Sequence, residues 1–201
     1  MPELGLFPLK VVLLPTEQIP LHVFEPRYKE LIGECIDTDG EFGLVLSDDE
    51  GLRAVGTKAR VTDVIERFDD GRLNVVVEGG ERFRLVELTS GRAFHTGEIE
   101  SIEDDDVDAE PADAERALGL FRRVAELAEA ETTEPEPSRV LSYEIAARIE
   151  LPIGLKQELL ESRSEPQRLK RLTQALDGIA ELLQRQRELR DLSSRNGHKR
   201  L

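Results

Sequence analysis

Residues 4–32 read LGLFPLKVVLLPTEQIPLHVFEPRYKELI, and this stretch decides the fold. Its first part consists of short apolar runs that are interrupted by Pro8, Pro15 and Pro20. Proline has no backbone N–H, so within sheets it lies at strand starts, edges and bulges. Prolines at such close intervals therefore predict brief strands that turn often, as in a small closed barrel.

The second part of the stretch changes to the period of a helix. From Pro26 onward the apolar side chains recur at helical spacing, at Tyr28, Leu31, Ile32, Cys35 and Ile36. This spacing places them on one face of a helix, and proline suits the first turn, where a missing N–H costs nothing. We therefore expect strands, a loop and a helix that covers one side of a sheet.

These motifs resemble the opening of the Lon substrate-binding domain, the N-terminal domain of the Lon ATP-dependent proteases, which also occurs alone or fused to other modules. The pattern FPL-x-x-V-x-LP-x-x-x-x-PL-x-x-FEPRY-x-x-L, from Phe7 to Leu31, carries the resemblance. Further segments continue it at 70–72 (DGR), 77–84 (VEGGERFR), 156–161 (KQELLE) and 168–172 (RLKRL). Together they span most of residues 4–185.

The predicted fold class is α+β. Short runs of period two, such as Val55 to Val61, predict strands, and 69–72 (DDGR) and Gly79-Gly80 are expected to turn the chain between them. The resemblance implies an N-terminal β-rich, PUA-like pseudo-barrel with one helix, and a C-terminal α-helical lobe that ends in a long helix. The expected divisions are a barrel-like lobe at 4–102, an acidic linker at 103–110, a helical lobe at 111–193 and a disordered tail at 194–201.

The composition of the chain limits the classes of partner and the compartment that we expect. The formal net charge of −15 repels phosphate backbones, whose binding needs clustered Lys and Arg, so we expect no nucleic acid. The single Cys excludes an internal disulfide and fits a reducing compartment. The N-terminus lacks the basic start of a signal peptide, and no apolar run approaches the roughly 20 residues of a membrane helix. A cytoplasmic protein with no membrane partner is expected.

The sequence carries no recognisable catalytic motif. It has neither the phosphate-binding pattern G-x-x-x-x-G-K-[ST] nor a G-x-S-x-G turn, and His22, His95 and His198 are too scattered for a triad. Aspartates alternate in the acidic linker as in a calcium loop, but Ala109 stands where the sharp turn needs Gly. We therefore expect no enzyme, no cofactor and no metal site, and a solvated linker.

The resemblance implies non-catalytic recognition of polypeptide, either unfolded or tagged for degradation, with a protease or chaperone as a further partner. An apolar groove or an exposed strand edge could bind such an extended chain. The candidate peptide-binding residues lie on the proline-broken loop, the helix entry and the barrel: Leu21, Phe24, Glu25, Arg27, Tyr28, Phe68, Arg82 and Phe83.

Several of these residues have a structural alternative. Glu25, Arg27 and Tyr28 could pin the first helix to the barrel, with Arg27 paired to a carboxylate such as Glu78. Arg82 and Phe83 have the same two alternatives, a binding role or a structural one. Cys35 lies on the apolar face of that helix and is expected to be an inert core residue.

The alternative function is a structural or assembly protein that forms a homodimer through its C-terminal helix. On that helix the leucines recur from Leu169 to Leu183, although such a seam is usually packed internally. A hydrolase that uses Glu25 or the acidic linker is a weaker alternative, because no base–nucleophile pair can be identified.

Overall fold

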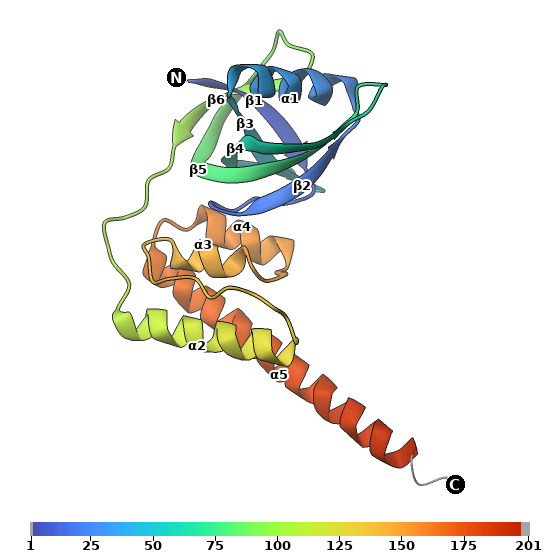
Figure 1. The fold of residues 1–201 in the computed structure, drawn as a ribbon. Helices are drawn as coiled ribbons and strands as arrows, with labels where there is room; N and C mark the ends of the chain where they lie inside the picture. Colours follow the sequence, from blue (N-terminus) through green and yellow to red (C-terminus); the bar gives the residue numbers. More distant parts are fainter. Residues whose placement is uncertain (1, 198–201) are drawn as a thin grey trace. The chain divides into compact units, whose positions relative to one another are not determined.

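A computed structural model of the chain describes residues 2–197, and the side chains up to residue 190 (Figure 1). The strands are β1 (Glu3–Leu9), β2 (Gln18–Val23), β3 (Glu41–Asp48), β4 (Gly51–Arg67), β5 (Leu73–Thr89) and β6 (His95–Ser101). The helices are α1 (Pro26–Thr38), α2 (Pro111–Leu127), α3 (Leu141–Ala146), α4 (Ile153–Glu161) and α5 (Glu165–Gly197). The predicted α+β class and the long final helix are confirmed. Helix α5 continues through residues 194–197, which were predicted as part of a disordered tail, and residues 198–201 lie outside the described residues.

The strands form one mixed sheet in the order β2-β5-β4-β3-β1-β6, and an additional pairing of β5 with β6 closes it. Strands β1 and β3 are parallel, and the other pairs are antiparallel. Because β5 is 17 residues long, its first part pairs with β2 and its last part with β6. Among the described strands, β2 pairs with β5 alone and therefore lies at a margin of the barrel (Figure 1).

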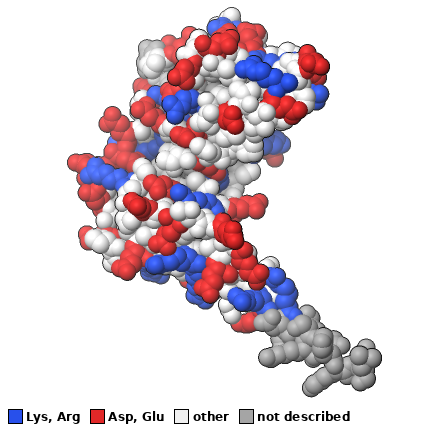
Figure 2. All heavy atoms as spheres, in the orientation of Figure 1, with Lys and Arg blue, Asp and Glu red and all other residues white. Residues whose placement is uncertain are grey.

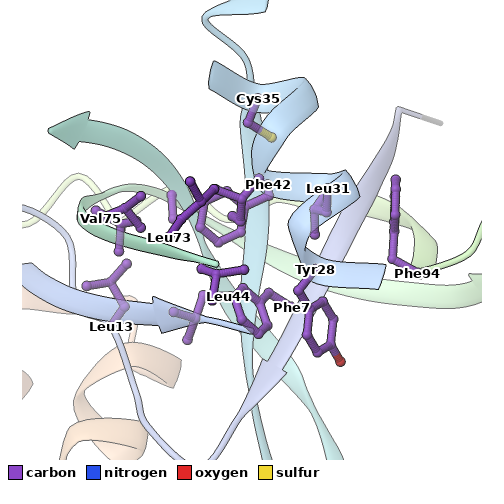
Figure 3. Packing of buried hydrophobic residues seen from close by; sticks show 14 residues of the cluster. Phe7, Leu13, Tyr28, Leu31, Cys35, Phe42, Leu44, Leu73, Val75 and Phe94 are labelled. Atoms are coloured by element: carbon purple, nitrogen blue, oxygen red, sulfur yellow. The ribbon is translucent and has the colours of Figure 1, made fainter. Parts of the chain in front are cut away.

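One apolar cluster fills the barrel beneath α1. Tyr28, Leu31, Ile32 and Cys35 are the buried residues of this helix, which confirms the predicted apolar face. Their side chains meet strand residues of the same cluster, and the rings of Tyr28 and Phe7 stack with centroids 4.1 Å apart (Figure 3). The helix is therefore held to the sheet by apolar burial, which is the dominant favourable term in folding.

The glycines Gly79 and Gly80 do not turn the chain, so the turn predicted there is wrong. Strand β5 runs through both residues. The N–H of Gly79 donates to the carbonyl of Glu17 at 2.9 Å, and its carbonyl accepts from the N–H of Thr16 at 2.8 Å. A Cβ on Gly79 would lie 2.2 Å from the carbonyl oxygen of Leu14, so the absent side chain allows the β1–β2 connection to approach the strand.

The described chain divides into two compact units. One contains residues up to 105 together with 149–163, and the other contains 106–148 and the chain from 164 onward. Helix α4 belongs to the barrel unit, where Lys156 Nζ donates to Glu17 Oε1 at 2.5 Å and Gln157 Nε2 donates to the carbonyl of Val55 at 3.2 Å. The residue ranges predicted for the lobes stay a prediction, but sequence periodicity alone did not indicate these barrel contacts of α4.

The other unit is built on the first half of α5, which packs against α2 and α3. Leu169, Leu172 and Leu176 are buried, so the seam on α5 is a core surface, as its amphipathic pattern predicts. Glu165 accepts hydrogen bonds from Ser142 and from the fully buried Arg168, although burial raises the pKa of the Glu165 carboxyl. Among the described helices of both units, none is long and apolar enough to span a membrane.

The close approach at Gly79 can be tested with a matched pair of variants. We expect Gly79→Ala to lower the free energy of unfolding by about 1–3 kcal/mol, because the new Cβ must displace the Leu14 carbonyl. Gly80→Ala is the control, since its Cβ would meet the Lys58 carbonyl at an ordinary 3.5 Å. Urea unfolding followed by circular dichroism measures both, and equal stability of the two variants would contradict the account.

The burial of Cys35 predicts slow thiol chemistry. Burial raises the pKa of its thiol to about 11, with a smaller contribution from the Glu34 carboxylate. Because the thiolate is the reactive form, native protein at about pH 8 should react with Ellman's reagent far more slowly than protein unfolded in guanidinium. The absorbance of the released thiol follows the reaction. Equal rates in the native and unfolded protein would show that α1 does not shield Cys35.

Candidate functional site

Tyr28, Arg82 and Phe83, which are candidate site residues from the sequence, are buried. Phe83 is 0% exposed and packs with Leu6, Val45 and Ile99 in a small second core of the barrel. Tyr28 is 4% exposed, and its ring lies in the main cluster with the hydroxyl pointing away from it (Figure 3). Burial also raises the pKa of Tyr28. In this conformation Phe83 presents no surface to a ligand, and Tyr28 presents little.

Arg82 holds together segments of the barrel unit. Its Nη1 donates to the carbonyls of Leu160 and Ser162 at 2.8 and 2.6 Å, and its Nη2 pairs with the Asp104 carboxylate. The next residue of the acidic segment, Asp105, forms an ion pair with a different arginine, Arg163. These contacts give Arg82 a structural role, which is the alternative that the sequence left open.

In the helical unit Arg139 pairs with Asp106 and Asp108 at 3.1 and 2.7 Å. The alternating aspartates of the acidic segment therefore have arginine partners. Within the described residues, no cluster of His, Cys, Asp and Glu side chains is placed to hold a metal ion.

Glu25 and Arg27 form a polar rim at the start of α1. Arg27 Nη2 lies 2.8 Å from Glu25 Oε2, and the guanidinium covers the Tyr28 ring at 4.5 Å from its centroid. The suggested pairing of Arg27 with Glu78 is wrong. Glu78 instead accepts a hydrogen bond from Gln18 at 2.7 Å and lies 3.9 Å from Arg60.

Phe24 and Phe68 are brought together by His22. The His22 ring stacks on Phe24 with centroids 5.9 Å apart and meets Phe68 edge-on at 6.2 Å. The guanidinium of Arg72 lies 4.8 Å from the centroid of the Phe68 ring. Phe24 is 59% exposed, although it is large and apolar. We refer to His22, Phe24, Phe68 and Arg72 as the aromatic cluster.

A hydrogen-bond chain orients His22 within the aromatic cluster. His22 Nδ1 lies 2.6 Å from Asn74 Oδ1, and Asn74 Nδ2 donates to Glu66 Oε2 at 3.1 Å. Because an amide oxygen can only accept, Nδ1 carries the proton in this contact. In the neutral ring Nε2 is then a hydrogen-bond acceptor. The contact with Asn74, which Glu66 holds in turn, fixes the orientation of the ring.

Asn74, Glu66 and Arg72 were not predicted as site residues from the sequence, and His22 was considered only as a member of a catalytic triad. His22 is opposite Asn74 in the β2–β5 pairing, and Asn74 is opposite Glu66 in the β4–β5 pairing. Only the strand register could have predicted that these residues are neighbours. Bulges in β4 against β5 make this register hard to predict from the sequence.

Strand β2 divides its side chains between the core and solvent. Ile19 and Leu21 pack against the main cluster, so the candidate residue Leu21 is half-buried. Gln18, Pro20 and His22 are exposed and uncharged, in a chain of which 34% of residues are charged. Figure 2 likewise shows uncharged surface on the barrel between acidic and basic side chains. The site therefore offers aromatic faces and a short uncharged strip, which suit apolar side chains.

Known proteins resemble this chain over most of its length. Residues 3–178 match the family described as the ATP-dependent protease La (LON) substrate-binding domain. A Lon protease of Anaeromyxobacter dehalogenans is 32% identical over 213 residues, which cover 96% of this chain. Lon protease 2 of Myxococcus xanthus is 31% identical over 96% of this chain. The chain spans 24% of the length of each of these relatives.

Two solved structures share the fold. A Lon N-terminal domain protein from Xanthomonas campestris superposes with a TM-score of 0.67 at 30% identity, and the match covers 86% of this chain and 97% of that one. The N-terminal domain of a Mycobacterium avium complex Lon protease gives a TM-score of 0.66 at 17% identity, over 88% of this chain and 98% of that one. The second similarity concerns the fold alone.

Phe24 and Phe83 differ in burial, and this difference predicts different costs of truncation. Phe24→Ala should change the free energy of unfolding by no more than about 0.5 kcal/mol, because an exposed ring leaves no cavity. Phe83→Ala should lower it by about 3–5 kcal/mol, since an emptied core position loses both transfer energy and contacts. Denaturant titration of the two variants beside the wild type measures the difference. A larger loss for Phe24→Ala would contradict the assignment of Phe24 to the surface.

Proposed function

The chain belongs to the LON substrate-binding domain family, and on this premise we propose that it binds non-native polypeptide and catalyses no reaction on it. The clients are segments of unfolded or degradation-tagged protein, and a protease or chaperone is the machine to which they pass. The predicted cytoplasmic location remains part of this proposal, supported by the buried free thiol of Cys35.

The exposed Phe24 is the observation that carries the proposal. Single apolar residues on a surface are normal, but Phe24 lies beside His22 and Phe68 in a group of aromatic rings. Aromatic side chains supply large contact area at low cost in conformational entropy, so such groups are common centres of binding surfaces. The Glu25–Arg27 rim and Arg72 border the apolar surface with polar groups, as in most recognition sites.

The proteolysis that the names of the longer relatives indicate is not transferred to this chain, which spans 24% of their length. The family that matches residues 3–178 is a substrate-binding domain by its description. In the described structure, the ordered groups around His22 are an amide and a carboxylate on the sheet. These hydrogen bonds hold the His22 ring in one orientation, which supports a role for His22 in binding.

Homodimerisation through the C-terminal helix is not favoured as the function. The leucines that suggested it pack inside the helical unit, where Leu172 and Leu176 are 0% exposed. A dimer through this seam would require α5 to leave α2 and α3.

The proposal predicts selective capture of unfolded protein. Fluorescently labelled α-lactalbumin that has been reduced and alkylated with iodoacetamide, which adds no charge, should bind the chain, whereas the native form should not. Phe24→Ala should weaken the binding about tenfold, which corresponds to the loss of about 1.4 kcal/mol at a central contact. Fluorescence anisotropy measures both affinities.

Leu182→Ala is the matched control, because Leu182 is 60% exposed and lies outside the aromatic cluster. Its affinity should equal that of the wild type. The proposal fails if the wild type does not distinguish unfolded from native lactalbumin. If Leu182→Ala weakens binding as much as Phe24→Ala, the aromatic cluster is not the site.

A further inference from the structure

We propose that strand β2 binds the client by strand addition: an extended segment of the polypeptide pairs with the backbone edge of Gln18–Val23 that β5 leaves open. The inference rests on the proposed function and specifies how the polypeptide is held. It concerns the outer edge of β2 at the margin of the sheet (Figure 1), where the described strands provide no second partner.

The ladder with β5 determines which backbone groups point to the open edge. The carbonyl of Glu17 accepts from Gly79 N–H, so this carbonyl faces β5. In an antiparallel ladder the direction alternates along the strand, so Ile19 and Leu21 also face β5. Gln18, Pro20 and His22 then direct their backbone groups away from β5. The edge offers the N–H and carbonyl of Gln18, the carbonyl of Pro20, and the N–H and carbonyl of His22.

The position of Pro20 agrees with this assignment. Proline has no N–H to give to a ladder, so within sheets it occurs at an edge with its nitrogen facing outward. Pro20 lies opposite Val76, and the carbonyl of Val76 accepts a hydrogen bond from Thr62 of β4 at 3.3 Å. Val76 therefore faces β4 and leaves Pro20 facing the open edge. A client strand would pair with Gln18 and His22 on either side of Pro20.

The charges around the edge define the client. Gln18, Pro20 and His22 are uncharged, and the nearby Glu17 and Glu25 are each paired with a cation, Lys156 and Arg27 respectively. The chain as a whole carries a formal charge of −15, which repels acidic segments. The occupant is therefore an extended segment without acidic residues in which apolar side chains alternate. One set of its side chains would extend the half-buried row of Ile19 and Leu21.

The aromatic cluster lies where this edge ends. His22 belongs to both features, since its backbone faces the open edge while its ring contacts Phe24 and Phe68. An added strand would bring one of its outward side chains beside the His22 ring and the exposed face of Phe24. Backbone pairing then supplies sequence-independent affinity, and the cluster selects a bulky apolar or aromatic side chain at one position.

The test uses the unmodified protein and a short fluorescein-labelled peptide in which valine and threonine alternate around one phenylalanine. Backbone N-methylation at each peptide position in turn removes one N–H. Strand addition predicts a period of two: methylation at alternate residues weakens binding about tenfold or more, whereas methylation at the residues between them has little effect. Anisotropy titrations measure this series.

Amide hydrogen exchange of the protein locates the edge. The N–H groups of Gln18 and His22 should exchange rapidly in the free protein and become protected when the parent peptide binds. Those of Ile19 and Leu21 are the internal control, because β5 should protect them in both states. Two-dimensional NMR on the isotope-labelled protein follows the exchange of all four amides.

The outcomes separate the two proposals. Peptide binding with protection of Gln18 and His22 and a period-two methylation pattern supports strand addition. Binding that leaves these amides unprotected, or that shows no alternation, overturns strand addition but leaves polypeptide binding intact. If neither the peptide nor unfolded lactalbumin binds, both proposals are overturned.

Discussion

The barrel depends on one close contact between backbones, where the connection between β1 and β2 crosses β5 at Gly79. Hydrogen bonds of Gly79 with Thr16 and Glu17 are possible only because no side chain separates the chains. The hydroxyl of Thr57 fixes the same connection by donating to the carbonyl of Leu13 at 2.6 Å. With the connection held, β2 starts in register on β5 and ends beside the hairpin that carries Phe68. The location of the aromatic cluster follows from this crossing.

The buried polar contacts of this connection fix where the loop lies and add little to the free energy of unfolding. Glu17 is 7% exposed, accepts the N–H of Leu14 and pairs with Lys156 of α4. A buried pair of this kind regains little more than the cost of removing its charges from water, whereas losing one partner would leave an uncompensated charge. Its effect is to permit one placement of the loop and of α4. The exposed ring of Phe24, by contrast, satisfies no internal packing requirement.

The sequence was sufficient for the fold class, the apolar face of α1 and the core seam of α5, because each rests on local periodicity. It was misleading at Gly79, since a glycine that permits a distant segment to approach looks the same as one that turns the chain. It could not separate Phe24 from Phe83, because each phenylalanine lies next to a charged residue in the sequence and only the tertiary structure buries one of them. His22 is far in sequence from Asn74 and Glu66, and only strand register brings the three residues together.

The combination of an open edge and an exposed aromatic cluster gives a physical basis for selecting non-native chains. A native protein hides most backbone donors and acceptors in its own ladders and helices, and it buries most of its aromatic side chains. An unfolded segment exposes both at once, and in an extended conformation its side chains alternate at the spacing of a strand. A surface that needs free backbone groups and a nearby apolar side chain together therefore rejects folded proteins on two counts. Backbone pairing reads no particular sequence and the aromatic cluster selects only one side chain, so under the two proposals the surface would distinguish unfolded segments mainly by the groups that they expose.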